Sequence, residues 1–285
     1  MSELDIRLIA TDLDGTFLGE KSRLIPQNGS AFQLAHNHGI QTAIASGRLA
    51  AVGRGMVLAL GLESCHIIGL NGAQIYPVPF GENARETAFP DTLRDACFDV
   101  ISQYGCLYNV YTSRAVYTNQ RMTAEREAQF RSSFINGGAE AHLSSDAFER
   151  AVHQPCLKLL FKPGGDEAAY QKARKEISAL GGVYITASGA GVSEIMLAGI
   201  SKASAVRALA QGLGIRMDQV MCFGDYDNDD EMLAACGVSV AMGNASLAAR
   251  EAAKYITADH REAGVALAVS ALLDGTLERF RKYAD

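Results

Sequence analysis

The sequence predicts an α/β protein, with a Rossmann-like core of parallel strands, helices on both sheet faces, and an inserted α+β cap domain with an antiparallel sheet. Three observations predict this fold. The 285 residues are 48% hydrophobic and only 20% charged, which is typical of a packed globular chain. Short apolar runs alternate with helical segments at both ends of the chain, as in βαβ units. The 28 glycines, against six prolines, indicate many tight turns between strands and helices.

The first part of the chain alternates strands and helices. A buried strand is expected at 4–11, and it ends at Asp12-Leu13-Asp14-Gly15-Thr16. Pro26 favours a helix start, and Gly39 closes that helix after His38. A strand at 40–45, a helix that follows Arg48 through Leu60, and a strand at 66–70 continue the pattern, and Asn71-Gly72 then predicts a turn.

The middle of the chain has a different pattern, which predicts a small α+β domain. Two short aromatic-rich strands at 107–111 and 115–118 flank Thr112-Ser113-Arg114 and are expected to form an antiparallel hairpin. A less regular stretch follows residue 134. The remaining expected elements here are helices at 91–103, 124–134 and 167–180 and strands at 157–161, 183–187 and 192–196.

From Lys202 the alternation resumes, so the middle block is interpreted as an insertion. Residues 1–82 and 191–285 are expected to form the α/β core, and residues 83–190 the inserted cap. The last part should contain helices at 202–212 and 228–235 and from Ser246 and Gly264, with strands at 220–223, 238–241 and 255–257.

Charge and targeting signals exclude several classes of protein. The net charge is −6 and the pI is about 5.6, whereas binding to nucleic acid needs a basic face. No apolar stretch reads as a membrane span, and the acidic start of the chain does not resemble a signal peptide. The six cysteines form no C-x-x-C pair, so buried, reduced thiols are expected. We therefore expect a cytoplasmic protein with neither nucleic-acid nor membrane partners.

Two clusters of acidic residues follow apolar strands. Asp12 and Asp14 lie two positions apart after the first strand, a spacing that places both carboxylates on one side of extended backbone. Alone, this pattern is equally compatible with an ordinary turn. The segment from Asp225 to Glu231 has five acids in seven residues and no base, which is more than helix capping requires. Such a set of hard oxygen ligands favours Mg²⁺.

Two further features favour an anion beside these acids. Ser46-Gly47-Arg48 follows the second strand and offers a hydroxyl, a glycine N–H and a helix N-terminus. Lys202 begins a helix, where the dipole favours an acid, so a buried anionic partner is expected for it. Singly, Ser46 is more often a cap and Lys202 a solvated charge; both gain weight from the acidic clusters.

Together these four motifs, in this order, resemble those of the haloacid dehalogenase (HAD) superfamily of phosphohydrolases. Asp12-Leu13-Asp14-Gly15-Thr16, Ser46-Gly47-Arg48, Lys202 and Gly224-Asp225-x-x-Asn228-Asp229 are similar to its first to fourth motifs. The position of the insertion, with Asn71-Gly72-Ala73, Met242-Gly243-Asn244-Ala245 and Gly264-Val265-Ala266, resembles the Cof-type branch with a type IIB cap. Ala203 departs from the glycine that usually follows the lysine.

The resemblance implies a Mg²⁺-dependent phosphatase that acts on a small phosphorylated metabolite, such as a sugar phosphate. Asp12 would be the nucleophile that forms an aspartyl-phosphate, and Asp14 the general acid and base. The cation would be held by the Asp12 and Asp225 carboxylates and the Asp14 carbonyl, with Asp229 in support. The phosphoryl oxygens would be bound by Ser46, Gly47, Lys202 and Asn228, with Arg48 and Asn71 as further substrate contacts.

Two other functions remain open from the sequence. A phosphomutase of the same superfamily would share this cap. A receiver module that binds phosphate on an aspartate is a different class, but it would be much shorter and would not need Asp14. The cap sequence does not identify the substrate, and a monomer and a homodimer are both compatible with the sequence.

Overall fold

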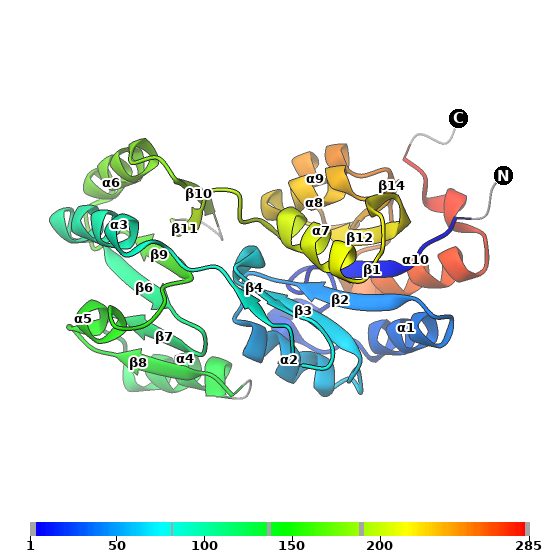
Figure 1. Ribbon diagram of the computed structural model, residues 1–285, viewed down its shortest axis with the longest axis horizontal. Coiled ribbons are helices and arrows are strands. Elements are labelled where there is room, and N and C mark those ends of the chain that lie inside the picture. The colour runs from blue at the N-terminus through cyan, green and yellow to red at the C-terminus, as the bar shows by residue number, and fades with distance from the viewer. Residues whose placement is uncertain (1–3, 81, 136–137, 188–190, 283–285) are drawn as a thin grey trace. The chain divides into compact units, whose positions relative to one another are not determined.

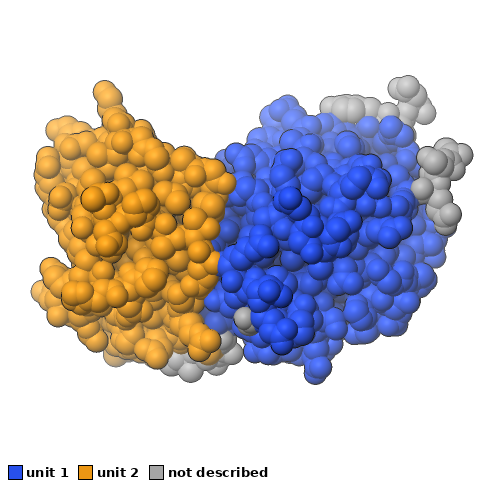
Figure 2. All heavy atoms as spheres, in the orientation of Figure 1, with its two compact units in different colours: residues 1–85, 201–285 blue, residues 86–200 orange. Residues whose placement is uncertain are grey.

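The computed structural model describes residues 4–80, 82–135, 138–187 and 191–282. The chain divides into two compact units, residues 1–85 with 201–285 (unit 1) and residues 86–200 (unit 2), coloured separately in Figure 2. Unit 2 extends to Ile200, beyond the boundary expected at 190, because β11 (Ser193–Leu197) pairs antiparallel with β10 (Val183–Ala187) and β9 (Lys158–Lys162).

Unit 1 contains a mainly parallel sheet in the order β14-β13-β12-β1-β2-β3-β4-β5 (Figure 1). Neighbouring strands from β14 to β3 are parallel, and β4 runs antiparallel to β3. The strands are β1 (Leu8–Thr11), β2 (Gln41–Ala45), β3 (Cys65–Gly69), β4 (Gln74–Tyr76), β5 (Arg85–Glu86), β12 (Val220–Gly224), β13 (Val238–Ala241) and β14 (Tyr255–Ile256).

Helices cover both faces of this sheet, as the sequence predicts. In Figure 1, α7 (Lys202–Gly212), α8 (Asp230–Ala235) and α9 (Leu247–Ala252) lie on one side, and α1 (Pro26–Asn37) and α10 (Gly264–Leu273) on the other. α2 (Ala50–Leu58) packs against β3. Because β1 lies between β12 and β2, its apolar side chains are fully buried in the core.

Unit 2 has its own sheet and its own apolar core. The strand order is β10-β11-β9-β6-β7-β8, with β6 (Leu107–Tyr111) and β7 (Ala115–Thr118) forming the expected antiparallel hairpin. Tyr108, Phe161 and Ile177 belong to a buried cluster distinct from that of unit 1. The other elements are α3 (Asp91–Gln103), α4 (Ala124–Ile135), β8 (Glu140–Leu143), α5 (Ala147–Ala151) and α6 (Glu167–Ala179).

Several local differences separate the expected from the observed elements, and among them β4 and β5 were not expected. The first strand begins at Leu8 rather than at residue 4, because pairing with β12 and β2 begins there. The helix expected from Asn228 begins at Asp230, after a 3₁₀ turn at Asp227–Asp229. β8 and α5 occupy the stretch that appeared irregular.

The state of the cysteines and the lack of a membrane-spanning segment were also expected from the sequence. All six cysteines are buried free thiols. Among the described residues, every helix is too short or too polar to cross a membrane.

Candidate active site

The candidate site lies where β1 and β12 end at the carboxyl edge of the unit 1 sheet. Asp12 follows β1, and its N–H donates to the carbonyl of Phe223 in β12 at 3.0 Å. Asp225 follows β12, and the Thr16 hydroxyl donates to its Oδ1 at 2.8 Å. Parallel strands place their following residues at one edge, so two segments far apart in sequence meet there.

Lys202 connects the acidic residues. Its ammonium lies 2.7 Å from Asp12 Oδ1 and 2.8 Å from Asp229 Oδ1, and its side chain is 1% exposed. Burial lowers the pKa of Lys202, but the charges of Asp12 and Asp229 outweigh burial and raise it. Lys202 therefore stays protonated. Its position follows from the start of α7, where Ser201 and Ser204 form a reciprocal cap.

Asp229 is held from both sides. Its Oδ1 accepts from Lys202, and its Oδ2 accepts from the backbone N–H groups of Asp225 at 3.0 Å and Tyr226 at 3.3 Å. The side chain packs closely on Gly224, where a Cβ would lie 2.4 Å from the Cβ of Asp229. Asp229 therefore fixes both Lys202 and the loop that carries Asp225.

Asp12, Asp225 and Asp229 form a group in which one carboxylate oxygen of each residue lies within 4.8 Å of the other two. Burial raises the pKa of Asp12 well above its usual value, and burial raises that of Asp225 to about 6. Three carboxylates share one ammonium in a buried place, so ionising all of them is costly without a cation. Carboxylate oxygens are the ligands that hard divalent cations prefer, so the donor set fits a divalent metal ion.

Asp14 lies outside this group, because the chain turns after Asp12 instead of remaining extended. Its side chain is 47% exposed and binds Arg48, which donates from Nε to Oδ2 at 2.6 Å and from a terminal nitrogen to Oδ1 at 2.7 Å. The hydrogen bond to Asp14 raises the pKa of Arg48. Asp12 and Asp14 therefore occupy different environments, one buried on Lys202 and one open to solvent on Arg48.

Four of the residues expected to bind phosphate or substrate lie together at the same edge of the sheet. Ser46, buried at the end of β2, accepts from the N–H of Arg48 at 3.2 Å. Asn71 donates from its backbone to the Ser46 carbonyl at 2.9 Å, and its side-chain oxygen accepts from Asn228 at 3.4 Å. At Gly47, a Cβ would lie 3.2 Å from Asn71 Oδ1. The ends of β2, β3 and β12 thus bring together Ser46, Gly47, Asn71 and Asn228.

Sequence reasoning assigned no role to three residues that contact this site. Thr16 and Asn244 lie inside quoted motifs, and Asn244 donates to the Gly15 carbonyl at 2.8 Å and to Asp225 Oδ2 at 3.4 Å. Ser22, by contrast, lies outside every motif. Its hydroxyl contacts both Asp14 and Arg48.

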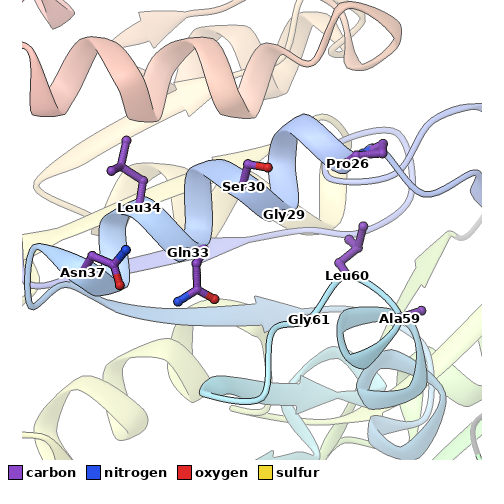
Figure 3. A pocket seen from close by; sticks show the side chains of 9 residues that line it. All are labelled: Pro26, Gly29, Ser30, Gln33, Leu34, Asn37, Ala59, Leu60 and Gly61. Carbon is purple, nitrogen blue, oxygen red and sulfur yellow. The ribbon is translucent and has the colours of Figure 1, made fainter.

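A surface groove elsewhere in unit 1 is separate from these residues. It has a volume of about 620 Å³ and lies between α1 and the residues that follow α2 (Figure 3). Its lining includes Ser30, Gln33, Leu34 and Leu60 but none of the candidate site residues.

Comparison with known proteins identifies a family and several related phosphatases. Residues 9–269 match the sequence profile of haloacid dehalogenase-like hydrolases. The chain is 28% identical over 267 residues to the 5-amino-6-(5-phospho-D-ribitylamino)uracil phosphatase YcsE of Bacillus subtilis, covering 94% of this chain and 96% of that protein. It is 30% identical over 240 residues to the HMP-PP phosphatase of Cronobacter sakazakii, covering 84% and 85%.

A solved structure shares the fold over nearly the whole chain. BT1666 from Bacteroides thetaiotaomicron, described among phosphatases of the HAD superfamily, superposes with a TM-score of 0.75 at 26% identity, covering 94% of this chain and 95% of that one.

Proposed function

The chain belongs to the haloacid dehalogenase-like hydrolases, as a phosphoric monoester hydrolase, and on this basis we propose that it is a Mg²⁺-dependent phosphatase acting on a small phosphorylated metabolite. The observation that supports this most directly is the buried group in which Lys202 bridges Asp12 and Asp229 beside Asp225. Membership of a hydrolase family also sets aside the alternative of a receiver module.

Asp12 is the nucleophile in this proposal. Lys202 binds its Oδ1, so we assign Oδ2 to attack on phosphorus. The new bond joins Oδ2 to phosphorus, and the ester P–O bond breaks. Asp14 donates the proton that the departing alkoxide takes, then removes a proton from the water that cleaves the aspartyl-phosphate. Its exposure to solvent suits this second step, because water reaches it directly.

Asp12 and Asp225 would hold Mg²⁺ with their carboxylates, and Asp14 with its backbone carbonyl. Asp229 supports the site through Lys202 and the Asp225 loop, since both of its oxygens accept hydrogen bonds. Two like unit charges 4 Å apart repel by about 4 kcal/mol at an effective dielectric constant near 20. The bound cation would supply positive charge that offsets this repulsion between carboxylate and phosphate.

Ser46, Gly47, Asn228 and Lys202 would bind the phosphoryl oxygens, through a hydroxyl, a backbone N–H, a side-chain amide and an ammonium. Phosphoryl transfer depends mainly on such positioning and charge stabilisation. Asn71 accepts a hydrogen bond from Asn228 and donates its backbone N–H to the Ser46 carbonyl. It is therefore proposed to contribute to the same subsite. Unit 2 is proposed to act as the cap that selects the leaving group.

The test is phosphate release from a panel of phosphomonoesters by the purified chain in Mg²⁺. The panel includes sugar phosphates and the substrates named for the two phosphatases above. Asp12→Asn should lower kcat by roughly 10³-fold or more, because a carboxamide is a poor nucleophile. Asp227→Asn is the control: Asp227 is an exposed aspartate of the loop that carries Asp225, and it lies outside the Asp12, Asp225 and Asp229 group. Equal activity of Asp12→Asn and wild type would contradict the mechanism.

Removal of the metal provides a second measurement. Excess chelator should abolish phosphate release, and added Mg²⁺ should restore it, because the site carries excess negative charge without a cation. Undiminished turnover in chelator would exclude the metal dependence. Conversion of a sugar phosphate into its isomer, without release of phosphate, would favour the phosphomutase instead.

A further inference from the structure

The segment Gly19–Arg23 forms a tight turn that returns to Asp14. Asp14 and Leu18 form an isolated bridge, and so do Gly19 and Arg23, where the N–H of Gly19 donates to the Arg23 carbonyl at 2.8 Å. Lys21 and Ser22 both have left-handed backbone, with φ of 54° and 59°. Non-glycine residues are uncommon in that region, and they recur where function requires a particular placement.

This turn places the Ser22 hydroxyl between the two charged side chains. The hydroxyl donates to Asp14 Oδ1 at 3.2 Å and accepts from a terminal nitrogen of Arg48 at 2.7 Å. Arg48 also binds both carboxylate oxygens of Asp14. Asp14, the turn that follows it and the more distant Arg48 thus form a closed ring of hydrogen bonds around one carboxylate.

Stability does not explain this ring. The side chains of Arg48 and Asp14 are 28% and 47% exposed, and ion pairs with such access to solvent contribute little to folding. Orientation does explain it, because an exposed aspartate with a single partner can rotate, whereas one bound at both oxygens by two residues is restricted. A proton donor is effective only when it is held within hydrogen-bond reach of the departing oxygen.

We propose that Ser22 is a positioning residue for the reaction: together with Arg48 it fixes the orientation of the Asp14 carboxylate. This role rests on the proposed function, in which Asp14 serves the leaving group. Substitution of Arg48 would combine two effects, because Arg48 was also expected to contact substrate. Substitution of Ser22 tests the positioning role more directly, because its hydroxyl hydrogen-bonds to Asp14 and Arg48.

The test compares two leaving groups in the full chain with Mg²⁺. The p-nitrophenolate leaving group departs without a proton, whereas an alkoxide leaving group needs one. The alkyl substrate is the ester that wild type hydrolyses fastest among glycerol, ribitol and hexose phosphates. Ser22→Ala and Ser22→Gly should lower kcat for the alkyl ester about tenfold, part of the 10²–10⁴ typical of a general acid, with KM within about twofold. Both should lower p-nitrophenyl phosphate hydrolysis much less, because Asp14 serves only the water that cleaves the aspartyl-phosphate in that reaction.

Three further variants complete the design. Ser22→Asn should recover most of the alkyl activity, because asparagine tolerates left-handed backbone and its amide both donates and accepts. Lys21→Gly, in the same turn, should match wild type for both esters. Asp14→Asn should lower the turnover of both esters, because both need a base for the water that cleaves the aspartyl-phosphate, with the larger loss for the alkyl ester.

The outcomes separate the two proposals. If wild type releases no phosphate from any ester, the proposed function fails and the role of Ser22 fails with it. If wild type is active and Asp14→Asn is selective for the alkyl ester, but Ser22→Ala matches wild type or loses both activities equally, the role of Ser22 alone is overturned.

Discussion

Gly15 links the nucleophile segment to the Asp225 loop through two separate constraints. Its φ is +84°, a conformation that disfavours any side chain. A Cβ on Gly15 would also lie 2.3 Å from Asp225 Oδ2, so the Asp225 carboxylate would have to move. Gly39 has a similar φ of +78° but open space around its Cβ position. This pair therefore separates backbone strain from displacement of Asp225.

Gly15→Ala should weaken Mg²⁺ binding by about 10–100-fold, the range observed when a neighbour that orients a metal ligand is changed. Gly39→Ala should leave Mg²⁺ affinity unchanged and cost about 1–2 kcal/mol of folding free energy from strain alone. Calorimetric titration of Mg²⁺ measures the affinity, and urea unfolding measures stability. Equal Mg²⁺ affinity in the two variants would show that the contact with Asp225 is unimportant.

At this scale, the residues that could be predicted were those that stand in motifs. Asp12, Asp225, Asp229 and Lys202 follow strands or begin helices, and the parallel topology brings such positions to one edge. Ser22 could not be predicted, because its contact depends on a left-handed turn that no local pattern of serine, lysine and glutamate indicates. The separation of Asp14 from Asp12 could not be predicted for the same reason. Their spacing suggested extended backbone, whereas the chain turns after Asp12.

Elements with strong start and stop signals form where the sequence predicts them. Asp91–Gln103 and Lys202–Gly212 match the expected helices residue for residue. β8 and α5 could not be predicted, because four and five residues are too short for a periodic pattern to register, and tertiary packing decides their conformation. Strand starts such as Leu8 depend on partners distant in sequence.

His66 in β3 connects β2 with the turn that follows β4. The N–H of Val78 donates to its Nδ1 at 2.9 Å, and its Nε2 lies 3.1 Å from Gln41 Oε1 in β2. Since Nδ1 must accept, the neutral ring with a proton on Nε2 satisfies both contacts. Burial lowers the pKa of His66 from 6.5 to about 4. The folded ring therefore stays neutral where the unfolded ring gains a proton.

Stability should consequently depend on pH through His66. Between pH 6.5 and 4 the unfolded state binds more protons, so the contribution is complete above pH 6.5 and is lost as pH falls toward 4. Between pH 7 and 5 the loss is about 2 kcal/mol. Urea unfolding at both pH values should show this loss in wild type but not in His66→Asn, whose amide oxygen can accept from Val78.

The comparison of wild type with His66→Asn also removes the opposing contribution that other groups make to the pH dependence of stability. Burial raises the pKa values of Asp225 and Asp230 to about 6, so their protonation favours the folded state as pH falls, in wild type and variant alike. An identical pH dependence in the two proteins would contradict the role of His66.

On the scale of the whole molecule, the two units have separate apolar cores, and the candidate metal ligands all belong to unit 1. A ligand that binds only the folded form of one unit stabilises that unit by mass action. Mg²⁺ should therefore stabilise unit 1 alone if the units unfold independently. The chain contains no tryptophan, so a single introduced tryptophan reports on the unit that carries it.

Phe280→Trp places a probe in unit 1, and Phe98→Trp places one in unit 2; both phenylalanines are partly buried against their own cores. Mg²⁺ at about 100 times its Kd adds about 2.7 kcal/mol to the bound unit. With a typical denaturant slope, the urea midpoint of the Phe280→Trp signal should rise by about 1 M. The midpoint of the Phe98→Trp signal should not move. Asp225→Asn, added to the Phe280→Trp protein, should remove the shift, because it removes a ligand. Equal shifts at both probes would mean that the two cores unfold as one cooperative system, and no shift at either would place the metal ligands elsewhere.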